Sequence, residues 1–132
     1  MQTFLPYPDF KKSLQSLDYR RLGKQRVEAY QIIRAIKFKG GYKNHPAVKM
    51  WQNNVNALKI YYNAALDEWI RRGYKNHMHK MIIRGRTTYP PWLGDKKFHA
   101  AHRSNLLRKD PVFYGKFGWQ ESPNLPYRWG SK

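Results

Sequence analysis

The chain contains no cysteine and few acidic residues. Its 132 residues include eight Asp and Glu against 26 Lys and Arg, which gives a formal net charge of +18 at pH 7. The absence of cysteine excludes a disulfide framework, a thiolate metal site and a thiol nucleophile, and it suits a reducing compartment. Any chemistry must therefore come from other groups.

Long apolar runs are also absent. No stretch approaches the roughly 20 apolar residues of a membrane span. The first residues, with Pro6, Pro8 and Asp9, lack the apolar core of a signal peptide. No segment separates an apolar face from a Lys/Arg face as an interfacial helix does. We therefore expect a cytoplasmic protein without a membrane partner, and a monomer.

The chain has positive charge spread over an apolar framework. Hydrophobic residues make up 41% of the chain and aromatic residues 16%, and the pI is about 10.3. A disordered basic tail would lack this apolar content, and its cations would stand in one block rather than between apolar positions. The pattern predicts one folded domain with a basic surface whose partner is nucleic acid.

Apolar residues recur at helical spacing in three segments, and almost no alternating pattern supports a sheet. The segments run from about residue 16 to 37, from 46 to near 73, and from 95 to about 108. Asp95 can cap the third helix, and Asn44-His45-Pro46 is a good start for the second because proline fits the first helical turn. The sequence thus predicts an all-α, compact single domain of three main helices.

The remaining segments are rich in proline, aromatic and basic residues. Residues 1–12 are predicted to form an extended apolar and aromatic arm, because their prolines forbid a regular helix. Such an arm usually packs on a core. Residues 74–94 are predicted to form a long basic loop, and long loops are often functional. Residues 109–132 form an aromatic, basic tail.

One carboxylate, Glu28, stands among cations in the first predicted helix. Four cations precede it in the same segment: Arg20, Arg21, Lys24 and Arg26. A carboxylate among cations stays ionised and would repel polyanionic DNA, so its presence needs a reason. The structural alternative is an ion pair with Lys24 one turn earlier, worth a few tenths of a kcal/mol. On this segment alone, the ion pair is the preferred interpretation.

Several residues are candidates for contacts with DNA. The four cations span nearly two helical turns and cannot all share one face, but two or three of them could grip phosphates around a lesion. Lys43, Asn44 and His45 precede the second helix, whose free amides favour a phosphate, and His45 is equally suited to capping that helix. The other candidates lie on the third helix and in the tail: His102, Arg103, Asn105, Lys109, Tyr114 and Lys116.

Four of the five histidines form two close pairs, His77 with His79 and His99 with His102. Neither pair has a nearby carboxylate or cysteine, so both make poor metal sites. We assign them to phosphate contact or solvent, with packing in the core as the competing interpretation of His102. No metal and no cofactor is predicted.

Four short motifs follow one another along the chain. Leu-Gly-Lys-Gln-Arg-Val-Glu at 22–28 is followed by Gly-Tyr-Lys-Asn-His-Pro-Ala-Val at 41–48, by Arg-Arg-Gly-Tyr at 71–74 and by an aromatic, basic stretch at 108–116. Together they resemble the pyrimidine-dimer DNA glycosylase family, the endonuclease V type of phages and bacteria. The match spans most of the chain in order.

The resemblance implies a small basic protein of three helices whose partner is double-stranded DNA containing a damaged or modified base. It implies that the N-terminal α-amine attacks the sugar C1′ of the damaged nucleotide, displaces the base and leaves a Schiff base. β-Elimination then breaks the strand. A glutamate on the first helix assists, and here that residue is Glu28. With the resemblance, the catalytic interpretation of Glu28 replaces the ion pair as the preferred one.

The start of the chain departs from the family pattern. The family's nucleophile usually follows removal of the initiator methionine before a small residue, whereas Gln2 is large. We therefore expect the amine of Met1 to be the nucleophile, unless processing exposes Gln2. An α-amine has a pKa of roughly 7.7–8.0, so a larger fraction of it than of a lysine side chain is unprotonated and nucleophilic at neutral pH.

Two alternatives stay open at this point. The first is the same chemistry on another modified or damaged base, because the sequence does not define the base pocket. The second is a DNA-binding or architectural protein without catalysis, which would keep the basic surface.

Overall fold

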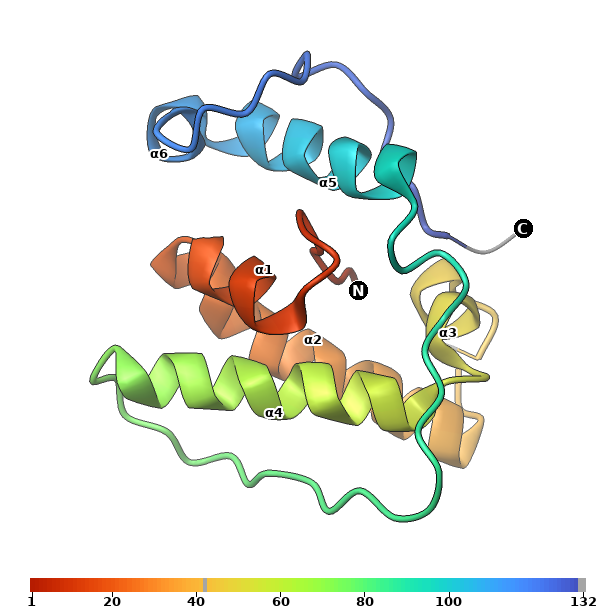
Figure 1. Cartoon of the computed structure of the whole chain (residues 1–132). Coiled ribbons are helices and arrows are strands. Elements are labelled where there is room, and N and C mark those ends of the chain that lie inside the picture. Colours follow the sequence, from red (N-terminus) through yellow and green to blue (C-terminus); the bar gives the residue numbers. More distant parts are fainter. Residues whose placement is uncertain (42, 131–132) are drawn as a thin grey trace.

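The computed structural model describes residues 1–41 and 43–130, and all regular structure in these residues is helical (Figure 1). Six helices are present there: α1 (Phe10–Ser16), α2 (Tyr19–Phe38), α3 (Pro46–Trp51), α4 (Val55–Arg71), α5 (Lys96–Lys109) and α6 (Pro111–Gly115). The three longest are α2, α4 and α5, which confirms the predicted all-α domain of three main helices. Tyr42 of the 41–48 motif and the last two residues of the predicted tail lie outside the described residues.

The predicted first helix and the predicted arm both need correction. Residues 10–16 form the separate helix α1, so the arm is free of helix only through Asp9, and α2 starts at Tyr19 rather than near residue 16. Each helix has its own N-cap, because the side chains of Asp9 and Asp18 accept backbone hydrogen bonds from Lys12 and Arg21. The backbone is extended at Leu17 and Asp18, which separates the two helices.

The predicted second helix is also two helices, α3 and α4. Asn54 interrupts it with φ −139° and ψ 47°, and its side-chain amide donates to the hydroxyl of Thr88 at 2.9 Å. The apolar stripe continues across the break, since Trp51 and Leu58 on either side are both fully buried. Periodicity alone therefore did not reveal the break. The third predicted helix is confirmed, with Asp95 as its N-cap.

Helices α2 and α4 form the central pair, and α1 and α3 also contact α4. The pair approaches closely at Gly23, where a Cβ atom would lie 3.2 Å from the ring of Trp69. Helices α5 and α6 lie on the other side of the N-terminal residues, which pass between the two groups of helices (Figure 1). This placement brings the start of the chain to the middle of the fold.

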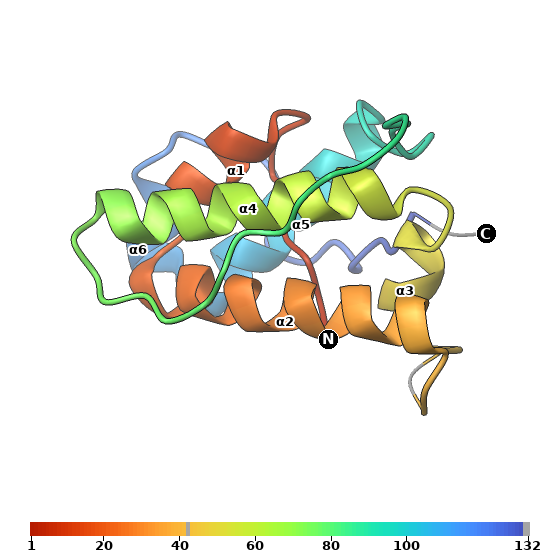
Figure 2. The same cartoon turned by 90° about the horizontal axis from the view of Figure 1, so that it is seen from below.

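The predicted long loop at residues 74–94 is confirmed, and we call it the strap because its backbone is bound along α4. It crosses in front of α4 (Figure 2), and polar side chains of that helix hold its backbone. Tyr62 donates to the carbonyl of His79 at 2.8 Å, and Asn63 both donates to and accepts from the backbone of Met81. The loop therefore has no need of regular structure to satisfy its polar groups.

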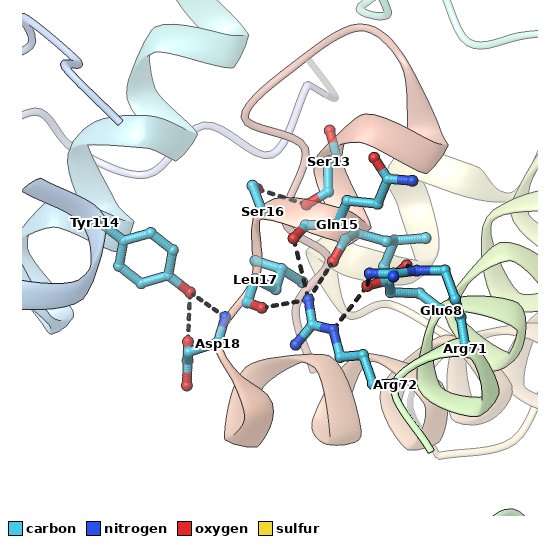
Figure 3. Close-up of polar contacts among 10 residues, drawn as sticks. Ser13, Gln15, Ser16, Leu17, Asp18, Glu68, Arg71, Arg72 and Tyr114 are labelled. Carbon is cyan, nitrogen blue, oxygen red and sulfur yellow. Dashed lines mark hydrogen bonds and ion pairs between the residues drawn. The ribbon is translucent and has the colours of Figure 1, made fainter. Parts of the chain in front are cut away.

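A polar network joins the end of α1 to the end of α4 (Figure 3). The guanidinium of Arg72 donates to the carbonyl oxygens of Leu14, Gln15 and Leu17 at 3.4, 3.1 and 2.8 Å. It also donates to the buried carboxylate of Glu68 at 2.7 Å. Because a short helix leaves most of its carbonyl groups without intrahelical partners, Arg72 supplies the donors that α1 lacks.

Replacing Arg72 with Met is expected to lower the free energy of unfolding by about 3 kcal/mol, because the Glu68 carboxylate loses a partner and three carbonyl groups each lose a hydrogen bond. Urea unfolding followed by tryptophan fluorescence measures the loss. Arg71→Met is the matched control, since Arg71 also binds Glu68 but is 63% exposed and touches no carbonyl of α1. A loss as large in the control would contradict the capping role of Arg72.

Candidate active site

The N-terminal amine lies against Glu28. The amine nitrogen of Met1 is 3.9 Å from Oε1 of Glu28, whose side chain is 23% exposed. Among the described residues, Glu28 therefore forms its ion pair with this amine. The structural alternative from the sequence had placed that ion pair with Lys24. Lys24 stands one turn earlier on the same face of α2 and acts on the carboxylate at longer range.

A cavity of about 330 Å³ opens beside Glu28. Its lining residues are Gln2, Phe4, Arg20, Arg21, Lys24, Gln25, Glu28 and Lys109. The cations come from the start of α2 and the end of α5, so two distant segments build one basic wall. The structure thus brings together six predicted site residues: Gln2, Arg20, Arg21, Lys24, Glu28 and Lys109. The four cations attract the phosphate backbone of DNA, although the carboxyl group of Glu28 lies among them.

The surroundings of Glu28 favour its protonated form more than the sequence suggested. Burial raises the pKa of Glu28 above its ordinary value of 4.5, although the N-terminal amine, Lys24, a backbone hydrogen bond with Gln2, and Lys109 act in the opposite direction. A carboxyl group with a raised pKa and access to a cavity is suited to proton transfer.

The other two glutamates are engaged elsewhere. Glu68 is 4% exposed and is held by Arg71 and Arg72, while Glu121 accepts two hydrogen bonds from Arg103 at 3.0 and 2.9 Å. These arginine hydrogen bonds hold the pKa of both carboxyl groups below the ordinary value. Glu28 is therefore the glutamate that faces both the cavity and the amine.

Gln25 belongs to the site although the sequence did not predict it. Its side chain is 1% exposed and reaches the carbonyl of Gln2 at 3.1 Å and Oε2 of Glu28 at 3.5 Å. The available signal was a polar residue three positions before Glu28 in the 22–28 motif. Spacing alone does not show that such a residue is buried.

Arg26 lies on the opposite side of α2, so its predicted role in DNA contact needs correction. Its guanidinium stacks over the ring of Trp69 at 3.9 Å from the centroid, and it donates to the side chain of Asn76 at 3.2 Å. Two positions along a helix correspond to a rotation of about 200°. Arg26 is therefore turned away from the cavity that Lys24 and Glu28 line.

His102 is a core residue, which confirms the competing interpretation and corrects the predicted contact with DNA. It is fully buried on α5, accepts a hydrogen bond from the backbone of Leu5 at 2.9 Å, and lies 2.9 Å from the carbonyl of Arg128. Its neighbour His99 is also buried and contacts the carbonyl of Leu5 at 2.7 Å. Neither histidine is free for phosphate or solvent.

Asn105 and Tyr114 are buried as well, and their predicted contacts with DNA are corrected in the same way. The amide of Asn105 donates to the carbonyl groups of Ala101 and Leu125 at 2.8 and 3.1 Å. The hydroxyl of Tyr114 donates to the carboxylate of Asp18, the N-cap of α2, as Figure 3 shows. Asn105 thus joins α5 to the tail, and Tyr114 joins α6 to the start of α2.

The remaining candidates lie outside the cavity. Arg103 is occupied by Glu121 and by the carbonyl of Pro6 at 2.8 Å. Lys116 is exposed, with its ammonium group 3.8 Å from the ring centroid of Phe113.

The residues before α3 line a different hollow. Lys43 and Asn44 are exposed and line a hollow of about 400 Å³ between the ends of α2 and α3. His45 accepts a hydrogen bond from the backbone of Ala47 at 3.0 Å, which confirms its capping role. A contact of these residues with DNA stays a prediction.

Residues 1–41 and 43–130 contain no group of three His, Asp or Glu side chains arranged to hold a metal ion. In the same residues, no helix has both the length and the apolar character needed to cross a membrane.

These features define a strongly basic, helical protein with a carboxylate in a cation-lined cavity and an amine beside that carboxylate, a combination suited to chemistry on DNA. Residues 1–82 match the protein family described as pyrimidine dimer DNA glycosylase. The chain belongs to this family of DNA-repair glycosylases, whose substrate is DNA with damaged bases. Comparisons with curated proteins and with solved structures gave no match. The matched residues include the amine, Gln25 and Glu28.

Proposed function

We propose that this protein excises a cyclobutane pyrimidine dimer from double-stranded DNA through a Schiff base and then cleaves the strand as an AP lyase. The observation that carries the proposal is the amine of Met1 at 3.9 Å from Glu28 beside a cavity lined by four cations. The family supports glycosylase activity on damaged DNA. The amine supports the choice of the Schiff-base route, because a nucleophile and its acid–base partner must be neighbours.

The first chemical stage replaces the base by the protein. The neutral amine of Met1 attacks C1′, the glycosidic C1′–N bond breaks, and the base leaves with the bonding electrons and takes up a proton. Loss of a proton from the nitrogen and opening of the C1′–O4′ bond, with protonation of O4′, then give the imine. Ionised Glu28 stabilises the cationic sugar and takes up and returns these protons.

The second stage breaks the strand. Protonation of the imine makes the C2′ hydrogen acidic, and removal of that hydrogen expels the 3′ phosphate as the C3′–O3′ bond breaks. Water then hydrolyses the imine, which releases the unsaturated aldehyde and restores the amine. The route is independent of a metal ion because the iminium group itself accepts the electron pair.

The whole chain, residues 1–132, is proposed to act as one glycosylase domain on DNA inside the cell. Arg20, Arg21, Lys24 and Lys109 would hold the phosphates that flank the lesion, with Lys43, Asn44 and Lys116 extending the contact. The part beyond the family match contributes directly, because Lys109 lines the cavity and α5 anchors the arm that carries the amine.

Borohydride trapping tests the proposal. The protein is mixed with duplexes that carry a cyclobutane dimer, an abasic site, another damaged base or no lesion, reduced, and mapped by mass spectrometry. We expect an adduct at the amine of Met1 on the dimer and abasic duplexes, and none on the undamaged duplex. An adduct at Gln2 would show that processing exposes that residue.

Two results would overturn the proposal as stated. Trapping on a different damaged base but not on the dimer would keep the chemistry and change the lesion. No adduct on any duplex, despite binding, would favour a DNA-binding protein without catalysis.

A further inference from the structure

The first residues of the chain are buried without belonging to a helix. Thr3, Phe4 and Leu5 are at most 4% exposed, so their backbone groups need partners in the interior. Side chains supply these partners from α2, α4, α5 and the tail: Gln25, Tyr61, His99, His102 and Tyr127. The arm is therefore held from several sides at once.

Gln25 has a special place among these partners. Its Oε1 accepts hydrogen bonds from the backbone of Phe4 at 3.0 Å and from the hydroxyl of Tyr61 at 2.7 Å. Its Nε2 donates to the carbonyl of Gln2 at 3.1 Å and reaches Oε2 of Glu28 at 3.5 Å. One buried amide thus contacts the residue next to the amine and the carboxylate that faces it.

The backbone N–H of Phe4 determines which way this amide points, because it donates to Oε1 and cannot accept. Tyr61 supports the same oxygen: it is fully buried, and its hydroxyl lies 2.8 Å from the carbonyl of Phe4 and 2.7 Å from Oε1 of Gln25. If the amide were reversed, its NH₂ group would face the N–H of Phe4, which can only donate, and its oxygen would face the carbonyl of Gln2 and the carboxylate of Glu28. The donor side of Gln25 is therefore directed at Gln2 and Glu28.

We propose that Gln25, supported by Tyr61, is a positioning residue that holds the N-terminal amine against Glu28. This inference rests on the proposed function, because it is there that the amine acts as the nucleophile. A free chain end would sample many positions, and ordering it would oppose each attack on C1′. A chain end anchored through its second and fourth residues has already lost that freedom when the DNA arrives.

The test compares three variants of the full chain. Gln25→Glu keeps the acceptor for Phe4 and Tyr61 but removes the donor to Gln2, and Tyr61→Phe is a milder change that removes one hydroxyl. Tyr62→Phe is the matched control, because this buried neighbour also donates to a backbone carbonyl at 2.8 Å, but on the strap at His79. For each protein we would measure stability, DNA affinity, the single-turnover excision rate at saturating DNA, and the rate at which a small reagent acylates the Met1 amine.

We expect Gln25→Glu and Tyr61→Phe to lower the single-turnover rate by about 10- to 100-fold with little change in DNA affinity. Acylation of Met1 should become severalfold faster in both, because the loosened amine leaves Glu28. Tyr62→Phe should lose similar stability to Tyr61→Phe, about 1 kcal/mol, and change neither rate.

The possible failures are distinguishable. Unchanged excision and acylation in both test variants, beside lost stability, would overturn the positioning role and leave the proposed function intact. A wild-type chain without any N-terminal adduct would overturn the proposed function and the catalytic purpose of Gln25 with it. Faster acylation in that case would show only that Gln25 anchors the arm.

Discussion

Glu28→Gln is expected to lower the single-turnover rate of base excision by about 10²- to 10⁴-fold, because an amide carries no negative charge and accepts no proton from the sugar or the amine. DNA affinity should stay the same or rise, since the variant removes a negative charge from a cavity lined by four cations. Trapping on dimer duplexes and a binding titration measure the two effects separately.

The same variant should be more stable than the wild type at neutral pH. Burial raises the pKa of Glu28 in the folded chain, so its favourable contribution is complete below pH 4.5 and is lost as the pH rises through the folded pKa. A neutral Gln removes that loss, and we expect a gain of about 0.5–1 kcal/mol. If Glu28→Gln loses excision activity but is more stable than the wild type, the loss of activity comes from a catalytic role of Glu28 and not from damage to the fold.

Asp67→Asn is the control for charge. Asp67 is exposed and pairs with Lys80 on the strap, so the change removes one negative charge away from the cavity. Its excision rate should match that of the wild type. Excision by Glu28→Gln within a few fold of this control would refute the catalytic role of Glu28.

The second large effect is a loss of stability in mild acid caused by the buried His102. Burial lowers the pKa of His102 from 6.5 to about 3, and it lowers the pKa of His99 as well. The unfolded chain therefore takes up protons that the folded chain refuses. From His102 alone, the free energy of unfolding should fall by about 1.4 kcal/mol per pH unit below roughly pH 6.5.

Between pH 6.5 and 4.5 the effect comes from the histidines with lowered pKa values, which are His102, His99 and the less buried His45. Asp18, Glu68 and Glu121 have lowered pKa values, so the stability that they contribute is present above about pH 4.5 and is lost only below it. Glu28 acts in the opposite direction within the window, because its folded pKa is raised. The measurement is therefore best made in the Glu28→Gln background.

Urea unfolding at pH 7, 6 and 5 gives the slope. We expect a total loss of about 2 kcal/mol between pH 7 and pH 5 from His102, and more with His99. The variant His102→Gln, if less stable at pH 7, should still show a smaller slope than the parent protein. Equal stability at pH 7 and pH 5 would contradict a neutral, buried His102.

Local features made much of this protein predictable. Periodicity and the cap at Asp95 correctly predicted α5, and the scarcity of acids made Glu28 visible among its cations. The grouping of Arg20, Lys24 and Glu28 also follows from local geometry, because residues four apart share one face of a helix. Composition likewise indicated nucleic acid, since charge and apolar content need no coordinates.

Other features depend on contacts between distant parts of the chain. The apolar stripe continues through the break at Asn54, so only the bond to Thr88 and the turned backbone reveal two helices there. His102, Asn105 and Tyr114 have polar groups that suit DNA equally well. Their burial is decided by the arm, the tail and α2, which supply their hydrogen-bond partners.

The sequence by itself determined the helical content, the basic surface and the identity of the single glutamate among cations. The tertiary structure alone decided that the amine of Met1 meets Glu28 across 27 positions of sequence and that Gln25 lies between them and the core. The physical reason is that periodicity and charge are properties of neighbouring residues, whereas the satisfaction of a buried polar group depends on whichever segments the fold brings around it.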